Sequence, residues 1–182
     1  MFTLDEFIRK IKEVSPEISS QPLCQTQHKP EAWSRPVCCF QNVWEKVKRD
    51  EGDICFGWTF IHRTNPQYGD YVIATHHAVW HAPDNKLIDV TPFTESTKHH
   101  PVTLAGNILF LVDESALPFE NETLTAPLPL KFFALSDNEE LKNYINKLAE
   151  EEQRHCQEIY SGKVNASQIS GVIYKSTDKT QR

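Results

Sequence analysis

The sequence predicts an α+β fold in which one helix packs on an antiparallel sheet. Apolar residues within 37–49 recur at intervals of three and four, which is the spacing of one helix face. The stretches 54–61, 71–80 and 86–91 are rich in apolar, β-branched and aromatic residues, and short polar segments connect them. Strands joined by short turns pair antiparallel, and 107–112 predicts a fourth strand.

Two further helices and one long loop are expected. Residues 3–14 carry one apolar face that ends before Pro16, whereas 15–36 is polar, shows no period and predicts a loop. Residues 137–160 predict the clearest helix, and Asp137 is expected to be its N-cap residue.

Length and composition indicate one domain with a short tail. The chain has 182 residues, of which 39% are hydrophobic, and this is enough for a single core. We expect residues 1–160 to form one α+β domain and residues 161–182 to form a polar C-terminal tail. Within the tail, 169–174 predicts an edge strand, and 175–182 is expected to fray.

Charge and hydropathy exclude some classes of partner. The net charge is −6 and no cluster of Lys and Arg occurs, which disfavours nucleic acid. No apolar run is long enough to span a bilayer, and the N-terminus lacks the apolar core of a signal peptide, so we expect no membrane partner and a cytoplasmic location. The five cysteines are odd in number and show no disulfide framework, which fits a reducing compartment. No Cys-x-x-Cys pair occurs, which disfavours a common structural zinc site.

Cys39 falls at the expected start of the helix over 37–49. Pro36 suits the first helical turn, where free backbone N–H groups and the positive end of the helix dipole favour an anion. Such a setting makes a thiol nucleophilic. The alternative is that Cys38 and Cys39 are small core residues, which is the usual role of a free cysteine.

His77 and Asp89 are the two residues that complete a possible site. His76 and His77 are adjacent on one predicted strand, so their side chains point to opposite faces. A five-residue loop centred on Pro83 places His77 directly opposite Asp89 on the next strand. Asp89 could then hold one ring nitrogen of His77 and leave the other nitrogen for a thiol.

The two possible turns of this hairpin predict different registers. The five-residue loop pairs Trp80 with Lys86, whereas a two-residue turn on Asp84-Asn85 would pair Trp80 with Asp89. The longer loop is the preferred interpretation, because a proline suits the interior of a loop better than a paired position.

Four short motifs carry a resemblance to a known superfamily. They are Cys39-Phe-Gln-Asn-Val, Gly57-Trp, His77-Ala-Val-Trp and Leu87-Ile-Asp-Val-Thr-Pro. The order of helix-borne Cys, strand-borne His and next-strand Asp resembles papain-like enzymes of the transglutaminase and arylamine N-acetyltransferase type. The motifs are more closely similar to a group of bacterial proteins, some of which carry a SecC-type zinc-binding tail. The likeness covers residues 39–93, and the C-terminal part lacks the ligands of such a tail.

The resemblance implies a papain-like or transglutaminase-like fold with a catalytic triad. Cys39 would be the nucleophile, His77 the general base and Asp89 the residue that orients the base. The residues of the matching motifs that we expect to contact substrate are Asn42, Trp58 and Trp80.

The expected function is a cysteine-dependent hydrolase of peptidase, isopeptidase or deamidase type. It would act on a protein or peptide through a thioester intermediate and would need no cofactor. Transfer of the acyl group to an amine, as in acyltransferases and transglutaminases, is the alternative reaction.

Two non-catalytic functions compete with this interpretation. Several residues are zinc ligands by type, although their spacing matches no common structural site. They are Cys38, Cys39, His76, His77, His81, His99 and His100. The tryptophans could also line the groove of a binding module, although a tryptophan is more often part of a core. They are Trp33, Trp44, Trp58 and Trp80.

Overall fold

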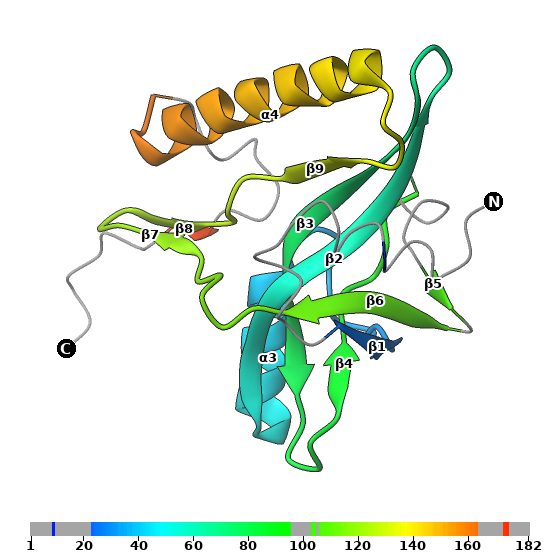
Figure 1. Cartoon of the computed structure of the whole chain (residues 1–182). Coiled ribbons are helices and arrows are strands. Elements are labelled where there is room, and N and C mark those ends of the chain that lie inside the picture. Colours follow the sequence, from blue (N-terminus) through cyan, green and yellow to red (C-terminus); the bar gives the residue numbers. More distant parts are fainter. Residues whose placement is uncertain (1–8, 10–22, 96–102, 105, 164–172, 175–182) are drawn as a thin grey trace.

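The computed structural model describes part of the chain, namely residue 9 and residues 23–95, 103–104, 106–163 and 173–174. Apart from residue 9, the helix expected over 3–14 lies outside the described residues, and so does the tail expected to fray. Helices and strands carry the labels of Figure 1. In chain order they are β1 (Leu23–His28), α3 (Cys39–Asp50), β2 (Asp53–Asn65), β3 (Gly69–His81), β4 (Leu87–Asp89), β5 (Thr103–Leu104), β6 (Asn107–Val112), β7 (Phe119–Glu120), β8 (Leu124–Ala126), β9 (Lys131–Ala134), α4 (Glu139–Tyr160) and β10 (Ile173–Tyr174).

These elements confirm the α+β class, but the main sheet is mixed. Strands β2, β3, β4 and β6 pair antiparallel as expected, whereas β1 pairs parallel with β4. Strand β1 lies in the segment 15–36, where the sequence predicts a loop, and that prediction is wrong. The segment has few β-branched or aromatic residues, so its pairing depends on partner strands far along the chain.

Strand β1 also closes the main sheet on itself. It pairs with β4 on one side and antiparallel with β6 on the other, so β1, β4, β3, β2 and β6 form a ring. The backbones of β2 and β6 approach closely at Gly57, where an added Cβ would lie 1.9 Å from the carbonyl oxygen of Leu111. A residue without a side chain is therefore needed at this point of the ring.

Helix α3 and helix α4 cover opposite faces of strand β3. Phe40 of α3 packs in a cluster with Ala78, whereas Leu141 of α4 packs in a cluster with Tyr71. Side chains alternate along a strand, so His77 shares the face of Tyr71 rather than that of Ala78. Figure 1 shows α4 running alongside β9, above the main sheet.

The C-terminal end of α4 contacts a second, smaller sheet of β7, β8 and β10. Ile159 packs with Leu124 of β8, and the ring of Tyr160 stacks on Phe119 of β7 with 4.0 Å between centroids. Strand β10 pairs with β8, so the described part of the expected 169–174 strand joins this small sheet.

The N-cap of α4 is Asn138, and the prediction of Asp137 is wrong. Oδ1 of Asn138 accepts hydrogen bonds from the backbone N–H of Glu140 at 2.9 Å and of Leu141 at 3.4 Å. In the part of the chain that the structure describes, no helix is long and apolar enough to cross a bilayer.

Candidate active site

Cys39 is the first residue of helix α3. The helix begins two residues later than the sequence predicts, so Pro36 precedes the helix instead of occupying its first turn. Cys38 is the N-cap residue and its side chain makes no capping hydrogen bond, and the first turn contains no acidic side chain. The side chain of Cys39 is buried, with 9% of the residue exposed, so the free N–H groups of the first turn act on it in a largely dry setting.

The residue that delays the start of the helix is Val37. Its φ of 56° lies in the left-handed region, which costs a β-branched residue about 1–2 kcal/mol. The segment before the helix is held by Asn42, whose Oδ1 accepts from the N–H of Arg35 at 3.0 Å and whose Nδ2 donates to the carbonyl of Arg35 at 2.7 Å. Strain two residues before a buried thiol is typical of functional sites.

Asn42 also ties this segment to the strand that carries Asp89. Its Nδ2 donates to Oγ1 of Thr91 at 3.2 Å, and the residue is only 3% exposed. All of these bonds are within the protein, so the structure gives no support to the expected contact of Asn42 with substrate. Asn42 instead fixes the start of α3 relative to the end of β4.

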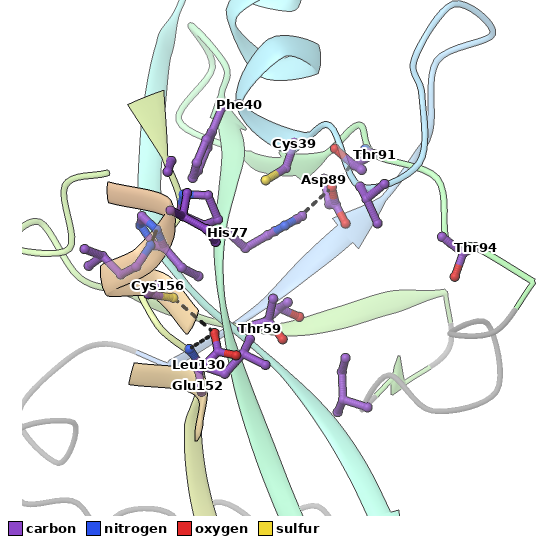
Figure 2. Close-up of a pocket in the computed structure, with 18 of the residues that line it drawn as sticks. Cys39, Phe40, Thr59, His77, Asp89, Thr91, Thr94, Leu130, Glu152 and Cys156 are labelled. Atoms are coloured by element: carbon purple, nitrogen blue, oxygen red, sulfur yellow. Dashed lines mark hydrogen bonds and ion pairs between the residues drawn. The ribbon is translucent and has the colours of Figure 1, made fainter. Parts of the chain in front are cut away.

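His77 and Asp89 meet on one face of the sheet. Nε2 of His77 lies 3.1 Å from Oδ1 of Asp89, and their side chains are 12% and 2% exposed. The carboxylate lies off the direction of the N–H bond, so the contact is an ion pair more than a straight hydrogen bond. Figure 2 shows the ring of His77 between the sulfur of Cys39 and the carboxylate of Asp89.

The register of the β3–β4 hairpin differs from the predicted one. Trp80 pairs with Ile88, which is two residues further along β4 than the predicted partner Lys86. A shift of two residues preserves the face on which each side chain lies, because two residues is the repeat of a strand. His77 and Asp89 therefore still meet, as diagonal rather than directly opposed neighbours.

The protonation of His77 is set by its two partners. Burial acts to lower the pKa of His77, but the carboxylate of Asp89 and the sulfur of Cys39 outweigh it and raise this pKa well above 6.5. The sulfur of Cys39 lies within hydrogen-bonding reach of the ring. Since Asp89 occupies Nε2, Nδ1 is the ring nitrogen left for the thiol.

His28 and Thr91 belong to the same cluster, although the sequence gives little sign of them. Nε2 of His28 lies 3.9 Å from Oδ2 of Asp89 and 2.9 Å from the carbonyl oxygen of Thr91. The backbone N–H of Thr91 donates to Oδ1 of Asp89 at 2.9 Å. His28 lies in the segment predicted to be a loop, so only the pairing of β1 with β4 brings it to the site.

A cavity of about 370 Å³ opens beside Cys39, His77 and Asp89. Strands β2 and β3, the segment after Asp89, the segment 126–130 and helix α4 supply its walls. Figure 2 shows Glu152 and Cys156 on α4, across the cavity from His77. Oε1 of Glu152 accepts from the N–H of Leu130 at 3.1 Å and from Sγ of Cys156 at 3.4 Å.

His76 has a structural role on the opposite face. Its Nε2 donates to the carbonyl of Ala116 at 2.7 Å, and its Nδ1 accepts from the N–H of Leu128 at 2.9 Å. Both ring nitrogens are occupied in the neutral form, and burial lowers the pKa of His76 to about 4. The two adjacent histidines thus differ in protonation because they face different surroundings.

The two tryptophans expected to contact substrate lie away from the cavity. Trp58 is 2% exposed within the core and donates from Nε1 to Oδ2 of Asp113 at 2.9 Å. Trp80 donates from Nε1 to the carbonyl of Glu51 at 2.8 Å, near the far end of α3. Neither lines the cavity, nor does Asn42.

The described residues offer no ready metal centre. In the ranges that the structure describes, no three His, Cys, Asp or Glu side chains converge in the manner of metal ligands. His99 and His100, two of the possible zinc ligands, lie outside those ranges. At the level of class, the fold and the site define an α+β protein with a buried Cys-His-Asp cluster beside a cavity.

Comparison with known proteins found no matching family model, no matching curated protein and no matching solved structure. The papain-like or transglutaminase-like class implied by the motifs therefore stays a prediction.

Proposed function

We propose that the protein is an enzyme in which Cys39 attacks an acyl carbon, with a papain-like or transglutaminase-like Cys-His-Asp triad. The observation that carries the proposal is the convergence of Cys39, His77 and Asp89 at the wall of one cavity. Cys39 comes from the start of a helix, and His77 and Asp89 come from two strands. Their arrangement is that of a covalent catalyst, in which a nucleophile contacts a base and a third residue orients the base.

The charges of the cluster favour the reactive form of the nucleophile. A raised pKa keeps His77 protonated near neutral pH, and a positive imidazole next to sulfur favours the thiolate. The free N–H groups at the start of α3 could then stabilise the oxyanion that forms when the thiolate attacks.

The proposed reaction has two halves. The Cys39 thiolate forms a bond to the acyl carbon, the bond to the leaving group breaks, and the leaving group takes a proton from His77. Water then gives a proton to His77 and attacks the thioester, which releases a carboxylic acid and restores the thiolate and the imidazolium. Hydrolysis of a protein or peptide amide is the favoured outcome, and transfer to an amine in place of water is the second candidate.

The setting of two other cysteines supports a selective nucleophile. Burial raises the pKa of Cys55 to about 11 and that of Cys156 to about 12, so both thiols stay protonated at neutral pH. All five cysteines are free, and on this ground we propose the reducing cytoplasm as the location of the protein.

The test is the labelling of each cysteine by iodoacetamide near pH 7, followed by mass spectrometry. We expect Cys39 to react first, and we expect His77→Ala to slow this reaction at least about a hundredfold because the positive charge beside the sulfur is lost. Cys38→Ala is the matched control and should leave the rate at Cys39 unchanged.

Circular dichroism of each variant checks that the fold is intact. Preferential labelling of Cys38, or an unchanged rate at Cys39 in a folded His77→Ala variant, would refute the proposal.

A further inference from the structure

The walls of the cavity beside Cys39 are mainly apolar. Among its described lining residues there is no lysine or arginine, and the only acidic side chains are Asp89 and Glu152. Just over half of the rest are aliphatic, aromatic or proline side chains, and the others are three histidines, four threonines and two cysteines. The apolar side chains include Val37, Phe40, Ile61, Phe93, Leu128 and Ile159.

Both carboxylates are already engaged by groups of the protein. Asp89 is 1% exposed and pairs with His77, while Oε1 of Glu152 already accepts two hydrogen bonds from Leu130 and Cys156. An anionic group in the cavity would lose its hydration and meet no lysine or arginine in the described lining, and the imidazolium of His77 is already paired with Asp89 and the sulfur of Cys39, which disfavours an anion.

The size of the cavity points to a small group rather than a length of polypeptide. Its volume of about 370 Å³ lies near the lower end of the range for small-molecule sites. An apolar protein cavity of roughly 150 Å³ already accepts benzene. Helix α4 and the segment 126–130 form walls opposite the sheet, so an acyl chain or a ring can lie between them and reach Cys39.

We propose that this cavity binds the acyl group of the substrate, and that this group is uncharged and apolar. The inference rests on the proposed function, because it is the thiol of Cys39 that takes the acyl group. The carbonyl carbon lies at Cys39, its apolar chain or ring extends toward α4, and the leaving group departs with the proton of His77. The sulfur–carbon bond formed then breaks by hydrolysis to the carboxylic acid.

The test measures binding in the Cys39→Ala variant, in which no turnover occurs, by NMR chemical-shift titration. We expect affinity to rise about fourfold for each methylene from acetamide to hexanamide, since each buried methylene is worth about 0.8 kcal/mol. Succinamate, which carries a carboxylate, and 6-aminohexanamide, which carries an ammonium group, should both bind more weakly than hexanamide. Tighter binding of either charged probe, or no dependence on chain length, overturns the inference.

A matched pair of leucine variants locates the site. Leu130→Trp, made in the Cys39→Ala background, should fill the cavity and lower the affinity for hexanamide at least tenfold. Leu117→Trp is the control, because Leu117 is 61% exposed and lies outside the cavity. Equal affinity in a folded Leu130→Trp variant would place hexanamide elsewhere and overturn the inference.

The two proposals fail in different ways. If Cys39 is the most reactive cysteine but hexanamide does not bind, the proposed function stands and the apolar acyl group is wrong. If hexanamide binds but Cys39 is unreactive, the cavity is a binding site for apolar amides and the proposed function is wrong.

Discussion

At the scale of single residues, Asp89 holds the centre of the site. Its two oxygens face His77, the N–H of Thr91 and, at a longer distance, His28. The backbone carbonyl of Asp89 also accepts from the N–H of Lys29 at 2.8 Å, which ties the residue to the end of β1. A carboxylate held from several directions keeps one orientation, and this is what a residue that orients a base must do.

Replacement of this carboxylate tests its effect on His77. In Asp89→Asn we expect the pKa of His77 to fall, because the charge of Asp89 is the main influence that raises it while burial acts to lower it. The pKa is read from the ring resonances of His77 in an NMR pH titration. Iodoacetamide labelling of Cys39 at neutral pH should slow in the same variant.

Asp113→Asn is the matched control for this prediction. Asp113 accepts a hydrogen bond from Trp58 and does not line the cavity of His77, so its removal should leave the pKa of His77 nearly unchanged. If His77 has the same pKa in the native protein and in the Asp89→Asn variant, the assigned role of Asp89 is contradicted.

At the scale of elements, one histidine ties the segment between β6 and β9 to strand β3 at two places. His76 bonds to Ala116 and Leu128, which lie at two places along this segment. Leu128 and Leu130 of the segment also line the cavity. His76 itself also lines the cavity, so its neutral form contributes to the shape of this cavity wall both directly and through the segment that it holds.

This arrangement predicts a pH dependence of stability. The pKa of His76 is about 4 in the folded state and near 6.5 in the unfolded chain, so between these values only the unfolded chain takes up a proton. The free energy of unfolding should therefore fall as the pH drops from 6.5 to 4, by about 3 kcal/mol at most from this residue. The raised pKa of His77 has the opposite sign, and its contribution is present below pH 6.5 and lost at higher pH.

The measurement is urea unfolding of the native protein and of His76→Gln at several pH values. Glutamine cannot titrate, so the difference between the two proteins isolates His76. We expect that difference to shrink as the pH falls from 6.5 to 4. A constant difference would show that His76 carries no such linkage.

At the scale of the whole molecule, strand β1 decides whether the sheet closes. It lies between β4 and β6, and it brings His28 and the N–H of Lys29 to Asp89. Thr26 in the middle of β1 is fully buried and pairs with Ile108 of β6. Disruption of β1 should therefore affect the site as well as the core.

Two substitutions of Thr26 separate the backbone from the side chain. Thr26→Pro should lower the free energy of unfolding by roughly 3 kcal/mol and slow the labelling of Cys39, because a proline does not fit a strand with partners on both sides. Thr26→Val should leave the stability unchanged or raise it by about 1 kcal/mol, because the buried hydroxyl has no hydrogen-bond partner among the described residues. Urea unfolding measures both, and a mild effect of the proline would show that ring closure matters little.

Local patterns in the sequence are sufficient to predict several helices and strands of this protein. The apolar stripe of α3, the strands β2, β3 and β6, and the helix α4 follow from periods that a few neighbouring residues define. The shared face of His77 and Asp89 could also be predicted, because a two-residue repeat survives the two-residue error in register. Those patterns are sufficient to indicate Cys39, His77 and Asp89 as one candidate site.

Only the tertiary structure decided the closure of the ring, the cavity and the roles of several polar residues. Strand β1 has a weak local pattern, and its pairing depends on β4 and β6, which lie far along the chain. The motif residues Asn42, Trp58 and Trp80 bond to backbone or core partners instead of lining the cavity, because side-chain direction is set by packing between distant elements. The position of helix α4 at the wall of the cavity could not be predicted either, because a contact between segments far apart in the chain produces no periodic pattern in the sequence.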